Sequence, residues 1–251
     1  MKAESAAETF ISPSTPRKIL KTIKKKIEML NDNPSIAIIG GTGREGSALA
    51  ARFTKAGFRT IIGSRSSSKA INAAYNLNTT FHTLNAEGCS NREATAKADI
   101  VLLAIPYNGV NPILEDIRPA ASGKVIINIA SSLDAEKKSR ARINPCGSIA
   151  MEIQNFLGAE AKVVDAFQNI SPEQLEKFDE KIEADVLVVG ADRETRDAII
   201  SVIKKIGIDA YDAGAIQNAV VVETMTAALI AINSRYKVKG CGLRVIGVPL
   251  N

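Results

Sequence analysis

Short aliphatic runs recur along the chain, and most of them alternate with stretches that have the spacing of amphipathic helices. A strand inside a parallel sheet is covered on both faces, so it is apolar throughout rather than at every second position. Strands that alternate with helices predict the α/β class, with a doubly wound parallel sheet. The buried strands are expected at residues 36–39, 60–63, 99–106, 124–129, 161–166, 185–190 and 208–211.

The segments between these runs predict the helices that cover the sheet. Helices are expected after the first strand up to Gly57, and at residues 69–77, 149–157, 194–206 and 216–234. Residues 78–98 are mostly polar and have no clear pattern before the next strand. The last helix differs from the others, because Val220 to Ile232 leaves almost no polar face. A helix that is apolar all round is buried, so we expect it between domains or in a subunit interface, and we expect a homodimer or a higher homo-oligomer.

A glycine-rich turn follows the first aliphatic run. Gly41, Gly43 and Gly46 have the G-x-G-x-x-G spacing of a dinucleotide phosphate loop. In such a loop the glycines allow a tight turn and a close approach of pyrophosphate to the backbone, and the following helix directs its free N–H groups at the anion. The second aliphatic run comes where a βαβ unit of Rossmann type would place its second strand. The alternative is a glycine turn that binds no ligand.

The end of that second run indicates which dinucleotide binds. An enzyme that uses NAD usually carries Asp or Glu there, but this chain has Ser64 and Arg65, with Lys69 soon after. Two cations and a hydroxyl suit a 2′-phosphate, so we expect NADP(H) as the cofactor. A solvated basic turn is the alternative. At the end of the third run, Tyr107 could line the nicotinamide side or could be a wall residue without ligand contact.

Three regions are expected on these grounds. They are an N-terminal extension at 1–34 with a basic amphipathic helix, an NADP-binding Rossmann domain at 35–168, and a small C-terminal α/β domain at 169–251. The extension carries seven basic residues against four acidic ones, and the chain as a whole has a net charge of +5. Its helix could contact a membrane surface or a partner, or it could pack on its own or a second subunit.

Composition excludes several classes of protein. The 251 residues are 45% hydrophobic, which allows a real core, and the body after the basic extension is close to neutral, which argues against nucleic acid as a partner. The three cysteines are far apart and have no metal-ligand spacing, so neither a disulfide framework nor a metal site is indicated. Without an uninterrupted apolar stretch of about 18 residues or a signal-type segment, we expect a soluble, cytoplasmic protein without a membrane span.

Acid–base chemistry has few candidate residues in this chain. The only histidine, His82, lies in the unpatterned stretch, and no tyrosine is followed by lysine four residues later. Hydride transfer between two redox cofactors would need only orientation from the protein. The same absence would fit a nucleotide sensor without catalysis.

The chain resembles the NADPH-dependent coenzyme F₄₂₀ reductases, also called F₄₂₀:NADP oxidoreductases, over roughly Ser35 to Pro249. The motifs that carry the resemblance are Gly40-Gly41-Thr42-Gly43, Gly63-Ser64-Arg65 with Lys69, Ile105-Pro106, Asp212-Ala213-Gly214 before the apolar helix, and Gly242-Leu243-Arg244-Val245. The resemblance implies coenzyme F₄₂₀ as the co-substrate, bound in a cleft with its deazaflavin against the nicotinamide, and no catalytic side chain. Members of that family can carry His and Pro where Gln168 and Ser171 stand here.

The resemblance also implies individual contacts. Those to NADP(H) fall on Thr42, Gly43, Arg44, Glu45, Ser64, Arg65, Lys69, Tyr107, Leu133 and Pro172. Those to the deazaflavin fall on Gln168, Ile170, Ser171 and Cys241. Two other functions stay open, an NADP(H)-sensing regulator without catalysis and an NADPH-dependent reductase of an imine or another small substrate.

Overall fold

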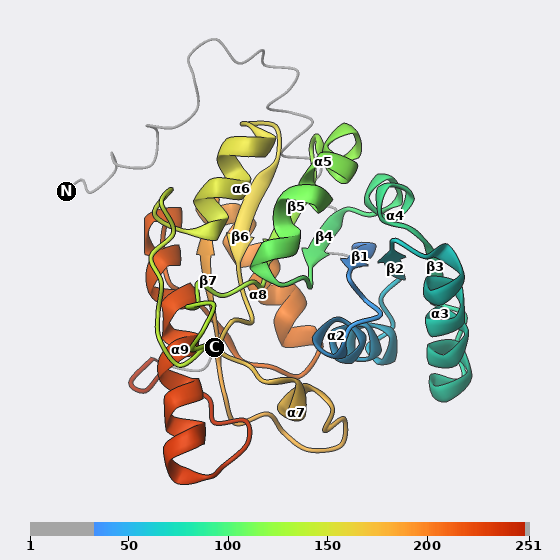
Figure 1. Ribbon diagram of the computed structural model, residues 1–251. Coiled ribbons are helices and arrows are strands. Elements are labelled where there is room, and N and C mark those ends of the chain that lie inside the picture. The colour runs from blue at the N-terminus through green and yellow to red at the C-terminus, as the bar shows by residue number, and fades with distance from the viewer. Residues whose placement is uncertain (1–32, 249–251) are drawn as a thin grey trace, which may run out of the picture.

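A single sheet organises the chain in the computed structural model, which describes residues 33–248 (Figure 1). Its eight strands have the order β3-β2-β1-β4-β5-β6-β7-β8. Neighbouring strands are parallel except β6 and β7, which are antiparallel. The strands are β1 (Ile36–Ile39), β2 (Thr60–Ser64), β3 (Ala86–Ser90), β4 (Ile100–Leu103), β5 (Val125–Asn128), β6 (Lys162–Asp165), β7 (Val186–Gly190) and β8 (Ala210–Asp212). The predicted α/β class and the doubly wound Rossmann-type sheet are confirmed.

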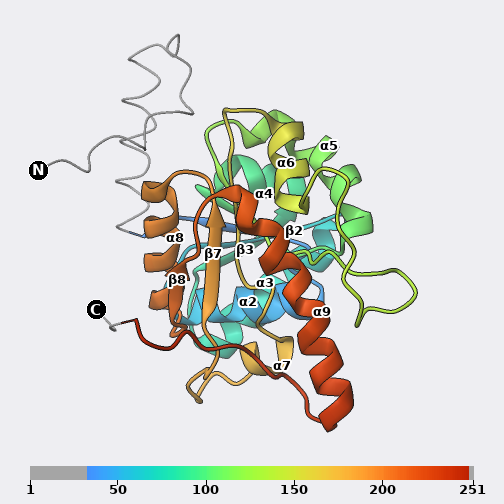
Figure 2. The ribbon, with the colours of Figure 1, turned by 90° about the vertical axis from the view of Figure 1, so that its left-hand side faces the viewer.

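Helices cover both faces of this sheet (Figures 1 and 2). They are α2 (Arg44–Lys55), α3 (Ser67–Phe81), α4 (Asn91–Lys97), α5 (Val110–Ala121), α6 (Ile149–Leu157), α7 (Pro172–Leu175), α8 (Arg193–Lys205) and α9 (Ala219–Tyr236), with short 3₁₀ turns η1 (Tyr107–Gly109) and η2 (Ile216–Asn218). Because alternate strand residues point to opposite faces, Ile36 and Ile38 join one core with α2, α3 and α8. Ala37 and Ile39 join the other, with α4, α5, α6 and the start of α9.

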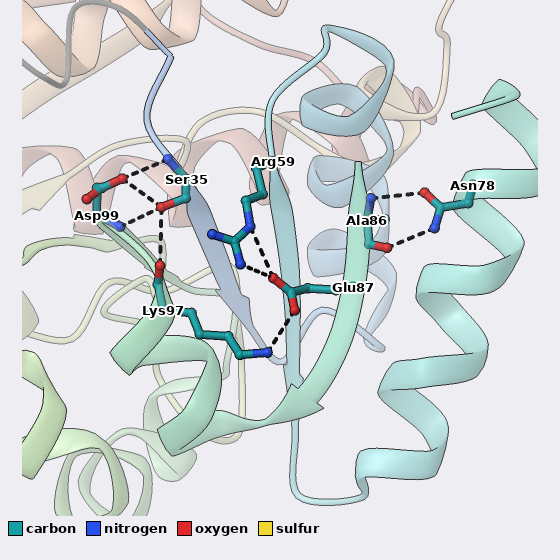
Figure 3. A network of polar contacts seen from close by, with 7 residues as sticks. All are labelled: Ser35, Arg59, Asn78, Ala86, Glu87, Lys97 and Asp99. Atoms are coloured by element: carbon teal, nitrogen blue, oxygen red, sulfur yellow. Dashed lines mark hydrogen bonds and ion pairs between the residues drawn. The ribbon is translucent and has the colours of Figure 1, made fainter. Parts of the chain in front are cut away.

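The edge strand β3 was not predicted, and its neighbours explain why it forms. Its sequence, Ala-Glu-Gly-Cys-Ser, has weak strand propensity. A Cβ on Gly88 would lie 2.2 Å from backbone atoms of Ala70, so α3 packs directly on the strand backbone. The Asn78 side chain exchanges two hydrogen bonds with the backbone of Ala86, at 2.8 and 2.9 Å, as Figure 3 shows. Tertiary contacts therefore keep β3 in the sheet, since its local strand propensity is weak.

Polar contacts join the amino ends of these strands, on the side away from the glycine turn (Figure 3). Glu87 of β3 accepts hydrogen bonds from Arg59 at 2.5 Å and Lys97 at 2.7 Å. Asp99 accepts from the Ser35 hydroxyl at 2.6 Å, at the start of β1. These contacts join the start of β2 and α4 to β3, and the start of β1 to the start of β4.

Two helices in the unpatterned or unassigned stretches were also missed. Helix α4 begins at a capping box in which Ser90 and Glu93 bond each other's backbone N–H groups, and this Ser-x-x-Glu pattern is visible in the sequence. Helix α5 has apolar residues at helical spacing, although Pro119 lies inside it. The predicted N-terminal helix lies outside the described residues.

Strands β7 and β8 continue the same sheet beyond β6. The chain after α9 turns back past the start of β7 (Figure 2), where the Asp185 N–H donates to Leu243 O at 2.8 Å. The expected division into domains at residues 168 and 169 stays a prediction.

Residues 33–248 do not cover helix α9 on every side. Val222 and Ala227 are buried, but Val221 is 57% exposed and Ile232 is 42% exposed. The segment Ile216–Tyr236 is long and apolar enough to cross a membrane by length and composition alone. It carries the buried acid Glu223, whose carboxylate accepts hydrogen bonds from the backbone of α6, so it packs here as part of the domain. Within the described residues the outer face of α9 is exposed, and its burial between domains or in a subunit interface stays a prediction.

Candidate functional site

The glycine turn lies at the carboxyl end of β1, where the sheet order reverses between β1 and β4. Gly40 has a φ of +80°, in the left-handed region that favours glycine. The Gly41 N–H donates to Ile38 O at 3.2 Å, and the Gly43 N–H donates to Gly40 O at 2.9 Å. The turn uses those two donors internally, whereas the first-turn N–H groups of α2 have no acceptor within the helix. These N–H groups form an anion site at the switch point of the sheet.

Gly46 and Gly43 have different structural roles in this turn. A Cβ on Gly46 would lie 2.5 Å from Gly40 O and 2.9 Å from the Gly41 Cα, so this glycine lets α2 pack on the turn. A Cβ on Gly43 would meet only Gly40 O, at 3.3 Å. The φ of Gly43 is −81°, which any residue can adopt. The space over Gly43 is therefore open on the ligand side, and a side chain would fill it. This cradle fits a pyrophosphate.

A basic turn lies beside it, at the end of β2. Ile39 and Gly63 are paired in the register of β1 and β2, so Ser64 and Arg65 follow directly from the neighbouring strand. Ser64 Oγ accepts from the Ser66 N–H at 3.2 Å. Arg65 and Lys69 are exposed, and neither has an ion pair or hydrogen bond within residues 33–248. Two uncommitted cations at this position suit a phosphate monoester.

Arg44, the first residue of α2, makes contacts that the sequence does not reveal. Its guanidinium bonds Glu173 at 2.7 Å and Glu176 at 3.0 and 2.9 Å. Glu173 lies in α7 and Glu176 is its C-cap, so these ion pairs hold α7, which begins at Pro172, against the start of α2. The hydrogen bonds to Glu176 and Glu173 raise the pKa of Arg44 further above its usual range.

Glu45, the second residue of α2, is half-buried and has no hydrogen-bond partner within the described chain. Burial raises the pKa of its carboxyl group to about 7. A carboxyl group at this position titrates near neutral pH, next to the anion site. It is therefore a group whose charge would oppose a bound pyrophosphate.

Tyr107 and Leu133 lie on the far side of the switch point. The Tyr107 hydroxyl donates to Glu152 of α6 at 2.9 Å and accepts from the buried Asn144 at 3.0 Å. Leu133 is half-buried, in a loop that folds back by a bridge to Ala141. Asn144 and Glu152 were not predicted, and they orient Tyr107 against α6.

The four residues expected at the deazaflavin lie around the start of α7 and the segment after α9. Ser171 caps α7, where its Oγ accepts from the Gln174 N–H at 3.3 Å. A Cβ on Gly240 would lie 2.6 Å from Ser171 Oγ, so the structure brings Ser171 beside Gly240 and Cys241. The Cys241 thiol donates to Leu229 O at 3.3 Å. Ile170 is 3% exposed and packs in the core.

Gln168 is buried at the carboxyl edge of the sheet. Its amide nitrogen donates to Asn128 O at 2.8 Å, and its backbone carbonyl accepts from the Thr226 hydroxyl at 2.7 Å. The Gln168 Oε1 accepts no hydrogen bond within the described residues. Asp165 and Glu223, which sequence reasoning missed, lie in the same buried polar cluster. The signals for them were an acid closing an apolar strand and an acid inside an apolar helix.

Other features of the described residues do not extend the site. A pocket of about 590 Å³ lies at the other end of α2, between Lys55 and Lys205, and none of the predicted residues lines it. His82 ends α3 in a left-handed conformation and is exposed. No cluster of His, Cys, Asp and Glu in residues 33–248 could hold a metal.

The fold and the glycine turn define a dinucleotide-binding protein of the Rossmann class. Residues 35–132 match the family model described as NADP oxidoreductase, coenzyme F₄₂₀-dependent. The F₄₂₀-dependent NADP reductase of Methanocaldococcus jannaschii is 34% identical over 223 residues, which cover 86% of this chain and 99% of that protein. The reductase of the same name from Methanothermobacter thermautotrophicus is 34% identical over 221 residues, which cover 85% and 95%. The chain therefore belongs to the F₄₂₀-dependent NADP reductase family.

Solved structures agree on the fold. A candidate F₄₂₀-dependent NADP reductase from Arthrobacter sp. FB24 has a TM-score of 0.68 at 22% identity, covering 82% of this chain and 96% of that chain. An imine reductase from Myxococcus stipitatus has a TM-score of 0.54 at 17% identity, covering 82% and 62%. At these identities the likeness concerns the fold alone.

Proposed function

We propose that this chain is an oxidoreductase that transfers a hydride between NADP(H) and coenzyme F₄₂₀. Two family members whose names state this activity align with this chain over nearly the whole of their own length. The observation in the structure that carries the proposal is the open cradle over Gly43, with two uncommitted cations, Arg65 and Lys69, at the end of the adjacent strand. When bound, NADPH supplies the hydride and the deazaflavin ring of F₄₂₀ accepts it.

The dinucleotide side of the site uses the backbone and two basic side chains. The first-turn N–H groups of α2 at Arg44, Glu45 and Gly46 face the pyrophosphate, and Gly41, Thr42 and Gly43 form the turn beneath it. Ser64, Arg65 and Lys69 hold the 2′-phosphate with charge-assisted hydrogen bonds. Tyr107, Leu133 and Pro172 border the nicotinamide half.

The deazaflavin side is formed by Gln168, Ile170, Ser171 and Cys241. Gln168 Oε1 is buried without a donor, and such a group usually has a partner, so an N–H group of a bound ring would satisfy it. Ser171 and Cys241 lie side by side at the start of α7. These residues bind and orient, and none of them needs to exchange a proton for the hydride to pass.

The F₄₂₀ absorbance band tests this activity. NADPH mixed with F₄₂₀ at slightly acidic pH should bleach the band, and NADP with reduced F₄₂₀ at slightly basic pH should restore it, because reduction of F₄₂₀ by NADPH consumes a proton. A band unchanged in both directions, while titration shows that NADPH binds, would contradict the proposal. The two alternative functions, an NADP(H)-sensing regulator and an NADPH-dependent reductase of an imine or another small substrate, would then be tested.

We infer further that two copies of the chain associate through the outer face of α9, in a reducing compartment such as the cytoplasm. The exposed Val221 and Ile232 on this helix support an interface, and the three unpaired cysteines support the compartment. Light scattering should give at least twice the 26.7 kDa chain mass, and Val221→Glu should halve it. A monomer for the unaltered chain at micromolar concentration would contradict the interface.

A further inference from the structure

Two acids meet in the interior where β6 ends and α9 passes. Asp165 is the last residue of β6, Glu223 lies in the second turn of α9, and both are 0% exposed. Their carboxyl groups are within hydrogen-bonding contact of each other. Two carboxylates so close cannot both be ionised in a medium of low polarity.

The neighbouring hydrogen-bond donors determine which of the two carboxyl groups is ionised. Glu223 accepts hydrogen bonds from the first two N–H groups of α6, Ile149 and Ala150, both at 2.9 Å. The hydroxyl of Ser132 also faces it. Three donors and the positive end of a helix favour an anion at Glu223.

Asp165 has a different set of neighbours. Asn128 of β5 donates to its Oδ1 at 2.8 Å, and the Gln168 side chain also donates to it. Its Oδ2 has no hydrogen-bond donor within the described residues. An oxygen that carries a proton needs an acceptor rather than a donor, and the Glu223 carboxyl group, which contacts Asp165, can supply one.

Within residues 33–248, no basic side chain contacts the pair. The groups that contact it from β5, the loop after β5, α6, the loop after β6 and α9 are amides, backbone N–H groups and a hydroxyl. In this part of the chain, Glu223 is the ionisable group that contacts Asp165, and Asp165 is the one that contacts Glu223. Burial, and then the Glu223 carboxylate, raise the pKa of Asp165 well above its usual range.

We propose that Asp165 and Glu223 share one proton. The resulting hydrogen bond holds α9 against the carboxyl end of β6, beside the cofactor site. The shared hydrogen bond joins β6 to α9, and Glu223 extends the link to the start of α6. Asp165 and Asn128 also hold the amide nitrogen of Gln168, so the pair positions Gln168 toward the second cofactor. Loss of the proton places two negative charges in contact and pushes α9 away from the sheet. Asp165 is thus a positioning residue.

Infrared difference spectroscopy on the ligand-free protein tests the proton directly. Asp165→Asn replaces the acid by an amide that donates permanently to Glu223, and Glu223→Gln gives the remaining carboxylate a donor. All spectra are recorded in a Glu45→Gln background, because the Glu45 carboxyl group has a pKa of about 7 and would add its own band at neutral pH. In that background the band of a protonated, buried carboxyl group should be present when Asp165 and Glu223 are intact and absent from both variants. Absence of this band with both acids intact, or its persistence in both variants, overturns the proposal.

The pH dependence of unfolding tests whether the shared hydrogen bond stabilises the contact of α9 with β6. The pKa of Asp165 is raised in the folded state, so its stabilising contribution is complete below the unfolded-state pKa and is lost as the pH rises through the folded-state pKa. The free energy of unfolding should fall with rising pH in the unaltered protein and should fall less in Asp165→Asn. Asp99→Asn is the matched control, since it makes the same substitution at a carboxylate that bonds Ser35 instead of another acid. Equal slopes for Asp165→Asn and the unaltered protein would overturn the proposal.

A kinetic measurement separates positioning from general stability, and this arm alone rests on the proposed function. The KM for F₄₂₀ should rise at basic pH in the unaltered protein, by at most about tenfold per pH unit because one proton is linked, and should stay flat in Asp165→Asn. The kcat should change little in either protein. If no turnover of F₄₂₀ is found at all, the proposed function fails, while the infrared and unfolding results still decide the shared proton. A flat KM in the unaltered protein would contradict the role in positioning Gln168.

Discussion

The two sides of the site are built from different parts of the chain. The phosphate-binding part of the proposed dinucleotide side consists of backbone groups, glycines and the side chains of Arg65 and Lys69 within one βαβ unit, from β1 through the start of α3. The proposed deazaflavin side consists of side chains from the loop after β6, the N-cap of α7 and the segment after α9. The phosphate-binding part is local in sequence, whereas the deazaflavin side forms only after distant segments have assembled around the sheet.

This difference decides how each side tolerates change. A backbone cradle fails when a Cβ fills it, whatever the chemistry of the side chain. A side-chain wall fails when a hydrogen-bond partner is lost, and a substitution that preserves the partner can rescue it.

Gly43→Val should abolish NADPH binding while the fold survives, because the new side chain meets only Gly40 O in the protein and otherwise fills the cradle. Gly46→Val should instead lose the fold, because its Cβ would lie 2.5 Å from Gly40 O. Circular dichroism and NADPH titration distinguish the two variants. NADPH binding by Gly43→Val at unaltered affinity would show that pyrophosphate does not lie over this glycine.

Arg65→Ala should weaken NADPH by roughly ten- to a hundredfold, or about 1.5–3 kcal/mol, because a charge-assisted contact to phosphate is lost. The affinity for NADH should hardly change, since NADH has no 2′-phosphate. Arg92→Ala is the matched control, because it removes one exposed positive charge from α4. Equal weakening of both dinucleotides by Arg65→Ala would remove its 2′-phosphate role.

The same contrast explains what could be predicted from the sequence. The aliphatic runs of β1, β2 and β4 and the spacing of Gly41, Gly43 and Gly46 are local signals, and the structure has each element there. Arg65 and Lys69 were likewise found from their position after a strand. The contacts of these residues with NADP(H) remain predictions.

The missed features depend on tertiary contacts. Strand β3 forms because α3 packs on Gly88 and Asn78 bonds the strand edge, and neither contact leaves a pattern in residues 86–90. Asp165 and Glu223 are far apart in the sequence, so their contact follows only from the passage of α9 over the end of β6. By contrast, the capping box of α4 was visible and could have been recognised.

Glu45→Gln should give a smaller effect that depends on pH. Burial raises the pKa of Glu45 to about 7, so its carboxyl group is neutral in acid and becomes charged beside the anion site as the pH rises through that value. NADPH affinity should therefore fall above neutral pH in the unaltered protein and stay flat in the variant, as titrations at a series of pH values would show. Parallel curves for the two proteins would exclude Glu45 as the source.

The same substitution has a consequence for stability. The folded-state pKa of Glu45 is raised, so its stabilising contribution is complete below the ordinary value of 4.5 and is lost as the pH rises toward about 7. Glu45→Gln should thus be more stable than the unaltered protein at basic pH, by roughly 1–3 kcal/mol, and the gain should shrink in acid. Denaturant unfolding at both pH values measures it.

His82→Asn should have the smallest effect of all, and it tests whether either side of the site uses an acid. Helix α3 begins at Ser67 beside the basic turn and ends 15 residues later, so His82 lies about 22 Å from that turn along the helix axis. Asparagine tolerates the left-handed conformation that His82 adopts, with a φ of 51°, so the C-cap should survive. Turnover of F₄₂₀ should be unaltered at every pH, with a stability change within about 0.5 kcal/mol. A tenfold loss of kcat without loss of stability would mean that a proton donor acts from outside the site, and hydride transfer by orientation alone would then be wrong.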